Sequence, residues 1–360
     1  RLSLVGSEMC IRDRQVDKSI VSALHFYVVN YLVCLPVLLA LLLFWVELPP
    51  WLALMCLVIG VGEHLSNEVY RFVLIAPRHR PVLFAALGKN IALLTIVALT
   101  LWLHPSMFAL DVLLTTWAVF SLAGIGAIAI SFSRTWAFAS FSLATGAGLR
   151  QRQQYFASRT HFLIGLVAVT LLQVDRLVVG ALLTLEQSGL YFRHILLASF
   201  AYQVFNVVSY GRVAPRVYEH IHSHRTAAAR AIIRRELSWL VPAAALVVAA
   251  GYLVRSVPFL NVPGIQSINP DYLAVLTLGY LVRAFADFNA LLLNGVYQER
   301  AVFISQVAAL GLTVVMSIIL TDLFGIPGTA ATLVLGAGAY YVASSLYVRR
   351  TPSLNGLVPP

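Results

Sequence analysis

The ionisable residues that could bind a ligand or couple an ion stand inside long apolar stretches of this chain. Glu63, Asn67 and Arg71 recur at every fourth position, which places all three on one face of a helix. Lys89, one of two lysines in the chain, lies within the next apolar stretch. A charge in the middle of a membrane costs about 2.5–3.5 kcal/mol on insertion scales, so such residues normally face a cavity or a partner. We therefore expect Glu63 and Arg71 to face a cavity.

A second group of intramembrane charges lies in the C-terminal half of the chain. Asp175 and Arg176 interrupt one apolar run, and Arg283 and Asp287 stand four residues apart in a later run. Arg283 with Asp287 is either a neutral pair within its own helix or part of a cavity, and Asp175 is either a brace between helices or an ion-coupling carboxyl. We expect at least two of the buried cations to line one shared central cavity. The candidates are Arg71, Lys89, Arg176, Arg283 and Asn67 for contact with a substrate, and Glu63, Asp175 and Asp287 for ion coupling.

No catalytic or metal-binding constellation is recognisable in the sequence. There is no paired acidic motif, no glycine-rich phosphate loop and no soluble domain between the apolar runs. His220, His222 and His224 alternate along the chain, but alternate residues of a helix do not converge on one ion. We therefore predict a protein without metal or cofactor that is not an enzyme, and these features favour transport.

Composition places the chain in a membrane. Hydrophobic residues make up 60% of it and charged residues 11%, with a mean hydropathy of +0.84, more apolar surface than a soluble protein of this length could bury. A helix needs about 20 apolar residues to cross the hydrocarbon core, and these runs lack the two-residue alternation of barrel strands. We predict an all-α polytopic membrane protein with about ten transmembrane helices. The expected spans are Ser19–Trp45, Trp51–Ile75, Val82–Leu103, Met107–Ile130, Thr160–Leu183, Ser188–Tyr210, Leu237–Val254, Tyr272–Val296, Val302–Phe324 and Gly328–Tyr347.

The basic residues between the spans set the expected orientation. They gather in alternate connections, whereas the opposite connections together hold a single arginine, Arg255. Basic loops stay in the cytoplasm, so we expect both ends of the chain on the cytoplasmic side of the inner (plasma) membrane. The net charge of +10 then reflects topology and contact with anionic lipids, and no binding of nucleic acid is expected.

The chain is expected to form two lobes joined by a linker. The stretch Leu4–Arg14, LVGSEMCIRDR, resembles a translated sequencing adapter, so the native amino terminus is expected to be missing. The linker mixes aromatic and basic residues as interfacial segments do, and a plain extension of the preceding helix is the alternative. In order, the expected parts are an adapter-like scar (1–14), a partial N-terminal lobe of four spans (15–130), a cytoplasmic or interfacial linker (131–159), a C-terminal lobe of six spans (160–350) and a tail (351–360).

Three stretches of the chain resemble one family of transporters. The first is QVDRLVVGALLTLEQSGLYFRHILLASF, with Asp175, Arg176, Gly180, Gly189 and Tyr191, followed by Pro215 in VAPRVYE. The others are NALLLNGVYQERAVF (Asn289–Phe303) and GIPGTAATLVLG (Gly325–Gly336). They are similar to the polysaccharide biosynthesis transporters, the O-antigen flippases of the multidrug, oligosaccharidyl-lipid and polysaccharide exporter superfamily. Arg193 and His194 depart from this pattern, because the family more often has small residues there.

The resemblance implies alternating access by two lobes around a central cavity, in a parent protein of twelve or fourteen helices. The implied substrate is a polyprenyl-diphosphate-linked oligosaccharide for surface polysaccharide or lipopolysaccharide synthesis, whose lipid tail stays among the membrane lipids. Cavity arginines would neutralise its diphosphate, and polysaccharide polymerase machinery is an implied partner. The alternatives are a drug/cation antiporter of the same superfamily and, from another class, a membrane glycosyltransferase or polysaccharide polymerase.

Overall fold

The computed structural model describes residues 30–75, 80–103, 110–135, 147–206, 211–256 and 268–354. The chain divides into two compact units, unit 1 (Arg1–Arg152) and unit 2 (Gln153–Pro360). The boundary between them falls inside the segment 131–159 that the sequence marks as a linker. The adapter-like residues 1–14 lie outside the described residues.

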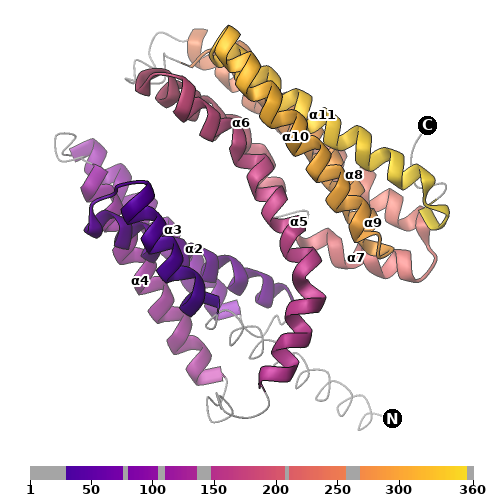
Figure 1. The fold of residues 1–360 in the computed structure, drawn as a ribbon, viewed down its shortest axis with the longest axis horizontal. Helices are drawn as coiled ribbons and strands as arrows, with labels where there is room; N and C mark the ends of the chain where they lie inside the picture. Colours follow the sequence, from indigo (N-terminus) through magenta and orange to yellow (C-terminus); the bar gives the residue numbers. More distant parts are fainter. Residues whose placement is uncertain are drawn as a thin grey trace. The chain divides into compact units, whose positions relative to one another are not determined.

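Every regular element among the described residues is a helix (Figure 1). Within this part of the chain, five helices are long and apolar enough to cross a bilayer, which makes this a membrane protein. The total of about ten spans stays a prediction. The five helices are Leu163–Leu182, Ala227–Leu253, Pro270–Gly295, Glu299–Phe324 and Ile326–Arg350. Shorter apolar helices cover Asn30–Trp45, Pro50–Ser66, Gly88–Val97 and Asp111–Ala127.

The helices of unit 1 pack against one another as a bundle (Figure 1). Gly62 allows the backbones of two of them to approach closely, because a Cβ atom there would lie 2.6 Å from the Cβ of Ser121. Small residues at such crossings are how membrane helices gain van der Waals contact without a hydrophobic driving force. The bundle comprises α2 (Pro50–Ile75), α3 (Arg80–Leu103) and α4 (Leu110–Thr135), with a short π-helix, η1 (Leu41–Trp45), against α2.

Unit 2 is built around one central helix, α9 (Pro270–Gly295). In the most apolar stretch of α9, 61% of the residues are buried, whereas 22% are buried in the corresponding stretch of α5. Asn269 caps its first turn by accepting a hydrogen bond from the Asp271 backbone, and Pro270 follows at the position that proline favours. The helices of this unit are α5 (Ala147–Leu182), α6 (Leu185–Val204), α7 (Gly211–His222), α8 (Thr226–Ser256), α9, α10 (Glu299–Phe324) and α11 (Ile326–Arg350), and of these α6, α7, α8, α10 and α11 pack on α9.

The last two helices form a tight hairpin. Gly325, with φ of +62°, ends α10 in a backbone conformation that glycine adopts readily. A Cβ at Gly328 would lie 1.8 Å from the Leu320 carbonyl oxygen, and one at Gly336 would lie 2.1 Å from Thr313 Oγ1. The glycines of α11 therefore set how closely it approaches α10.

Helix ends agree best with the expected spans for α2, α3, α9, α10 and α11, each of which begins and ends within about three residues of the prediction. Two helices begin much earlier than their spans. Helix α5 begins at Ala147, inside the expected linker, and α8 begins at Thr226. Both extensions are rich in alanine, arginine and glutamine or glutamate, which favour helix, so the helix continues beyond the apolar run.

Helix α7 has no counterpart among the predicted elements. It is amphipathic: Val213, Val217 and Ile221 are buried four residues apart, while Arg216 and Glu219 are exposed. Its apolar face lies against α8 and α9. Burial also raises the pKa of the Tyr218 phenol on this helix.

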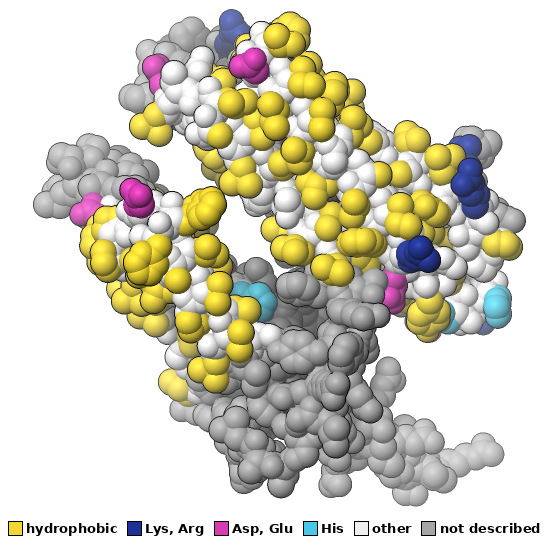
Figure 2. All heavy atoms as spheres, viewed as in Figure 1, with side chains coloured by type: hydrophobic (Ala, Val, Ile, Leu, Met, Phe, Trp, Pro, Cys, Tyr) yellow, Lys and Arg dark blue, Asp and Glu magenta, His cyan; other side chains and the backbone are white. Residues whose placement is uncertain are grey.

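The outer faces of the helices carry large apolar side chains (Figure 2). Leu185, Leu196 and Leu246 are among the most exposed residues of unit 2. Such a surface would be unstable in water, but it suits the hydrocarbon of a bilayer. Several polar side chains of the same helices are buried, among them Asp175, His194 and Arg283.

Candidate functional site

The candidate site is a buried polar network inside unit 2. It begins at Asp175 of α5, which is completely buried and accepts a hydrogen bond from the Tyr191 hydroxyl of α6. Asp175 Oδ1 has no hydrogen-bond partner among the described residues. The contact joins two helices, as a brace does, but it leaves one carboxylate oxygen unsatisfied.

The neighbouring Arg176 points to a different helix. Its Nη1 donates to Gln173 Oε1 at 2.6 Å, and its Nη2 donates to the Tyr280 hydroxyl of α9 at 3.4 Å. The side chain is half-buried, so the guanidinium lies at the margin of the network. Asp175 and Arg176 thus tie α5 to two neighbouring helices by polar contacts.

A second pair of charges lies deeper along α9. Arg283 Nε donates to Asp287 Oδ1 at 3.3 Å, and the Tyr202 hydroxyl of α6 donates to Asp287 Oδ2 at 2.7 Å. The guanidinium carbon of Arg283 lies 4.7 Å from the centre of the Tyr340 ring of α11, a cation–π contact. The Tyr340 hydroxyl in turn accepts a hydrogen bond of 3.2 Å from Gln306 Nε2 of α10.

Two tyrosines connect the two pairs of charges. The rings of Tyr202 and Tyr280 lie 5.3 Å apart with an interplanar angle of 35°. Tyr280 contacts Arg176, and Tyr202 contacts Asp287. The network therefore runs without a break from α5 through α6 and α9 to α11 and α10.

Small pockets lie on either side of Tyr280. One is lined by Arg283 and Thr313 and by the apolar side chains of Leu171 and Leu172, which belong to α5. The other lies between α6, α8 and α9 and includes Thr277, whose hydroxyl has no partner among the described residues. Each has room for little more than a water molecule. In this conformation neither pocket is large enough for a sugar.

The network is neutral as a whole, because two carboxylates accompany two guanidinium groups. Buried charges that lack a partner cost several kcal/mol each, so neutrality explains how this cluster is tolerated between apolar helices. Arg176 and Arg283 are therefore both engaged by partners within the network.

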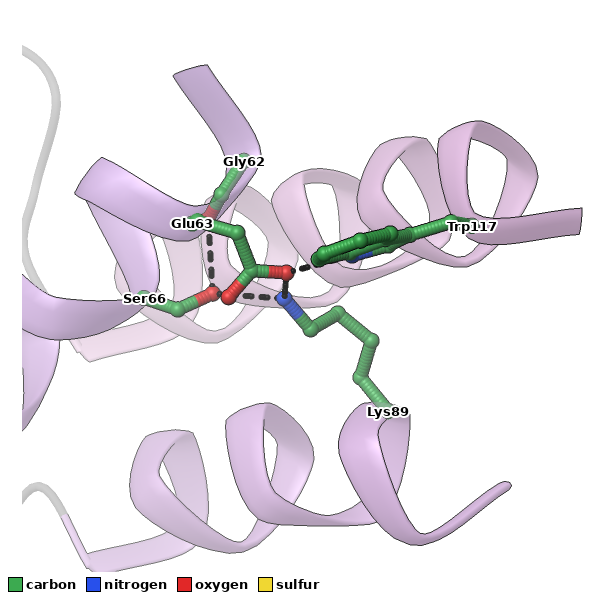
Figure 3. Close-up of polar contacts among 5 residues, drawn as sticks. All are labelled: Gly62, Glu63, Ser66, Lys89 and Trp117. Atoms are coloured by element: carbon green, nitrogen blue, oxygen red, sulfur yellow. Dashed lines mark hydrogen bonds and ion pairs between the residues drawn. The ribbon is translucent and has the colours of Figure 1, made fainter. Parts of the chain in front are cut away.

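A separate ion pair lies in unit 1 (Figure 3). Lys89 Nζ of α3 donates to Glu63 Oε1 at 2.7 Å and to Ser66 Oγ at 3.2 Å, and Trp117 Nε1 of α4 donates to the same Glu63 oxygen at 2.9 Å. The Lys89 side chain is 2% exposed and that of Glu63 is 32% exposed. Ser66 donates to the Gly62 carbonyl at 2.7 Å. The pair thus links the helices of this bundle.

The structure brings several of the candidate residues together and leaves others aside. Glu63 meets Lys89 in unit 1, and Arg283 meets Asp287 in unit 2, within the network that also contains Asp175 and Arg176. The side chains of Asn67 and Arg71 lie outside the described residues. A central cavity shared by the cations of both units stays a prediction.

The histidines have structural surroundings. His194 is fully buried; its Nε2 accepts a hydrogen bond of 2.7 Å from the Asn269 backbone N–H, and its Nδ1 lies 2.8 Å from the Leu190 carbonyl. Nε2 is therefore the acceptor nitrogen of the ring, and Nδ1 is the nitrogen that donates to the Leu190 carbonyl. His222 lies 3.1 Å from the Gly295 carbonyl. Within the described residues, no three histidine, cysteine or acidic side chains gather as a metal site would require.

Sequence reasoning missed the tyrosines that organise the network. Tyrosine in a membrane helix usually marks the interface with water, so Tyr202, Tyr280 and Tyr340 did not stand out. One signal was present: Tyr280 precedes Arg283 by three residues and Asp287 by seven, which places all three on one face of α9. Trp117 carried no comparable signal.

Three comparisons with known proteins found no relationship. No family model, no curated protein and no solved structure matches the chain.

Proposed function

We propose that this protein is a transporter that moves a lipid-linked oligosaccharide across a membrane by alternating access. The observation that carries the proposal is the network of unit 2, in which Arg176 and Arg283 lie among helices whose outer faces are apolar. Membrane helices rarely hold charged groups without a function. The three stretches of sequence similar to O-antigen flippases support the same conclusion.

The chemistry of the two arginines suits a diphosphate headgroup. A guanidinium group binds phosphate oxygens through two parallel hydrogen bonds and stays charged at every physiological pH. The polyprenyl tail of such a substrate remains in the hydrocarbon, where the exposed leucines of unit 2 already face lipid. We propose that the headgroup crosses along the polar interior while the tail stays outside.

The cellular setting follows from the same proposal. The protein works in the inner membrane with its basic connections in the cytoplasm. It receives the substrate on the cytoplasmic leaflet, and polysaccharide polymerase machinery uses the product on the other side. Glu63, Asp175 and Asp287 are the carboxylates available for coupling transport to an ion gradient.

Asp175 favours a second candidate function, a drug/cation antiporter. Its Oδ1 atom is buried without a hydrogen-bond partner among the described residues, and a cationic substrate would satisfy it. Against this candidate, Arg176 stands beside Asp175 and would repel a cation. Transport assays with an organic cation and with a lipid-linked oligosaccharide distinguish the two.

The proposal is tested by measuring lipid-linked intermediates in the host membrane. Arg176→Ala should lower surface polysaccharide and cause intermediates to accumulate on the cytoplasmic leaflet, because losing one charge-assisted contact costs roughly 1.5–3 kcal/mol. Arg176→Lys should rescue in part, since lysine keeps the charge without the bidentate geometry. The exposed Arg255→Ala in the last turn of α8 is the matched control.

The same assay separates a transporter from an enzyme. A glycosyltransferase or polymerase variant prevents its own product from forming, whereas a blocked flippase leaves a complete lipid-linked substrate on the wrong leaflet. Normal polysaccharide in the Arg176→Ala variant, or intermediates that never form, contradicts the proposal.

A further inference from the structure

Asp287 is neutralised by one cation among the described residues. Arg283 Nε donates to its Oδ1 from the same helix, and the Tyr202 hydroxyl donates to its Oδ2 from α6. From α11, the Tyr340 ring faces the guanidinium of Arg283, and Gln306 of α10 holds that tyrosine by its hydroxyl. No second cation within the described residues forms an ion pair with Asp287.

Arg283 also faces a pocket. Its side chain, 6% exposed, lines the cavity that Thr313 of α10 shares, and Leu171 and Leu172 close that cavity from α5. Of the helices that line this cavity, α5 is less buried than α9: 22% of the residues in its apolar stretch are buried, against 61% in α9. A movement of α5 would therefore open the pocket to a ligand while the α9–α11 side keeps its packing.

An anion in this pocket takes Arg283 away from Asp287. The guanidinium that turns toward phosphate oxygens gives up its contact with Asp287 Oδ1, and the carboxylate, whose side chain is 16% exposed, is then largely buried without a compensating charge. Such a charge is strongly unfavourable between membrane helices. Tyr202 still donates to Oδ2, but a neutral hydroxyl does not cancel the charge.

We infer that Asp287 takes up one proton when Arg283 binds the phosphate of a substrate, so that phosphate and proton enter the site together. The inference rests on the proposed function and adds to it the ion that accompanies the substrate. Arg283 Nε leaves Oδ1, Oδ1 accepts a proton that the buffered aqueous phase gives up, and the carboxylate becomes a neutral carboxylic acid. Tyr202 keeps its hydrogen bond to Oδ2 throughout.

A proton fits this place better than a sodium ion. A hard cation needs several oxygen ligands, and the described contacts of Asp287 supply one hydroxyl oxygen besides the carboxylate itself. A proton needs only Oδ1. The coupling is reciprocal, since a site that gains a proton on binding phosphate also binds phosphate more tightly when the proton is present. The affinity for phosphate should rise by about tenfold for each unit of falling pH while Asp287 is ionised before binding.

The test measures proton uptake on binding. The full chain is placed in nanodiscs of phosphatidylethanolamine and phosphatidylglycerol and titrated calorimetrically with farnesyl diphosphate, in buffers of different ionisation enthalpy. The pH is held above the last ionisation of the diphosphate, so that the ligand itself releases no proton. About one proton should be taken up per ligand bound, as a single titrating carboxylate requires.

Variants assign that proton to Asp287. Asp287→Asn should bind farnesyl diphosphate without proton uptake and with little dependence on pH. The double variant Arg283→Gln with Asp287→Asn keeps the pair neutral and folded; it should lose the proton uptake and also bind at least tenfold more weakly. Asp322→Asn, at an exposed carboxylate near the end of α10, should keep the proton uptake of the unmodified protein.

Each outcome decides the matter. Binding without proton uptake, binding that needs sodium, or uptake that persists in Asp287→Asn overturns the inference and leaves the flippase proposal standing. Failure of the folded protein to bind farnesyl diphosphate contradicts both. Inorganic diphosphate serves as a second probe. Proton uptake with inorganic diphosphate shows that the phosphate groups suffice. Proton uptake only with farnesyl diphosphate shows that the ligand is a lipid diphosphate.

Discussion

Two buried ion pairs in this protein differ in how they are held. The Glu63–Lys89 pair of unit 1 joins different helices; Trp117 donates a further hydrogen bond to Glu63, and the Ser66 hydroxyl accepts one from Lys89. The Arg283–Asp287 pair of unit 2 lies within one helix and faces a pocket. Separating the first pair separates helices, whereas separating the second changes only side chains. The first pair therefore suits folding, and the second suits a change of partners.

The largest expected effect comes from removing the cation of unit 1. Lys89→Met should lower the free energy of unfolding by about 3 kcal/mol, near the low end for a broken buried pair because Glu63 keeps some exposure. Reversible unfolding in mixed micelles measures the loss. Adding Glu63→Gln should restore most of it, because no unpaired charge remains. If Lys89→Met left the protein stable but impaired transport, the Glu63–Lys89 pair would serve transport and not folding.

The second effect belongs to unit 2. Tyr202→Phe removes the hydroxyl that donates to Asp287, at a cost of about 1.5–3 kcal/mol for a hydrogen bond to a charged group. We expect transport per folded molecule to fall as well, because Asp287 is then less firmly oriented when Arg283 leaves. Tyr341→Phe, at a more exposed tyrosine of α11, is the control. Equal transport by the two variants would show that the network does not serve transport.

A smaller effect tests how tightly the lysine of unit 1 is confined. A Cβ at Gly124 would lie 2.7 Å from Lys89 Cδ, whereas one at Gly126 would meet nothing within 4 Å. Alanine gains helix propensity equally at both positions. Gly124→Ala should therefore be less stable than Gly126→Ala by about 1 kcal/mol, the low end for overpacking against a flexible side chain. Equal stabilities would mean that Lys89 moves freely.

The smallest effect is expected for Trp117→Phe. It removes the indole hydrogen bond to Glu63, but the Glu63 side chain is 32% exposed and retains Lys89, so water replaces the lost donor and the unfolding free energy should fall by only about 0.5 kcal/mol. Transport per folded molecule should stay unchanged. A transport defect as large as that of Tyr202→Phe would erase the distinction between the two pairs.

The sequence was sufficient to locate most of the described membrane helices, but not their contacts. Continuous apolar runs located α9, α10 and α11 closely, because burial in lipid and helix length are local properties of the chain. Helix α7 was missed, since its three buried apolar residues are spaced among arginine and histidine. The early start of α5 was missed because good helix formers continue it beyond the membrane run.

The sequence likewise identified candidate residues by their chemical type, but it did not identify most of the residues that they contact. An ionisable residue in an apolar run stands out, so Lys89 and Asp287 were recognisable. Their partners on other helices depend on packing angles that no single segment encodes, which is why Trp117 and Tyr202 were not predicted. The Arg283–Asp287 contact was foreseeable because four residues separate its members on one helix.

The most direct measurement of the central claim is flipping by the purified protein in proteoliposomes. A lipid-linked oligosaccharide is distributed over both leaflets, and a membrane-impermeant glycosidase reports how much becomes accessible with time. We predict rapid access with the unmodified protein and with Glu63→Gln/Lys89→Met, and slow access with Arg283→Gln/Asp287→Asn. Access no faster than in protein-free liposomes, with folded unmodified protein present, would contradict the account.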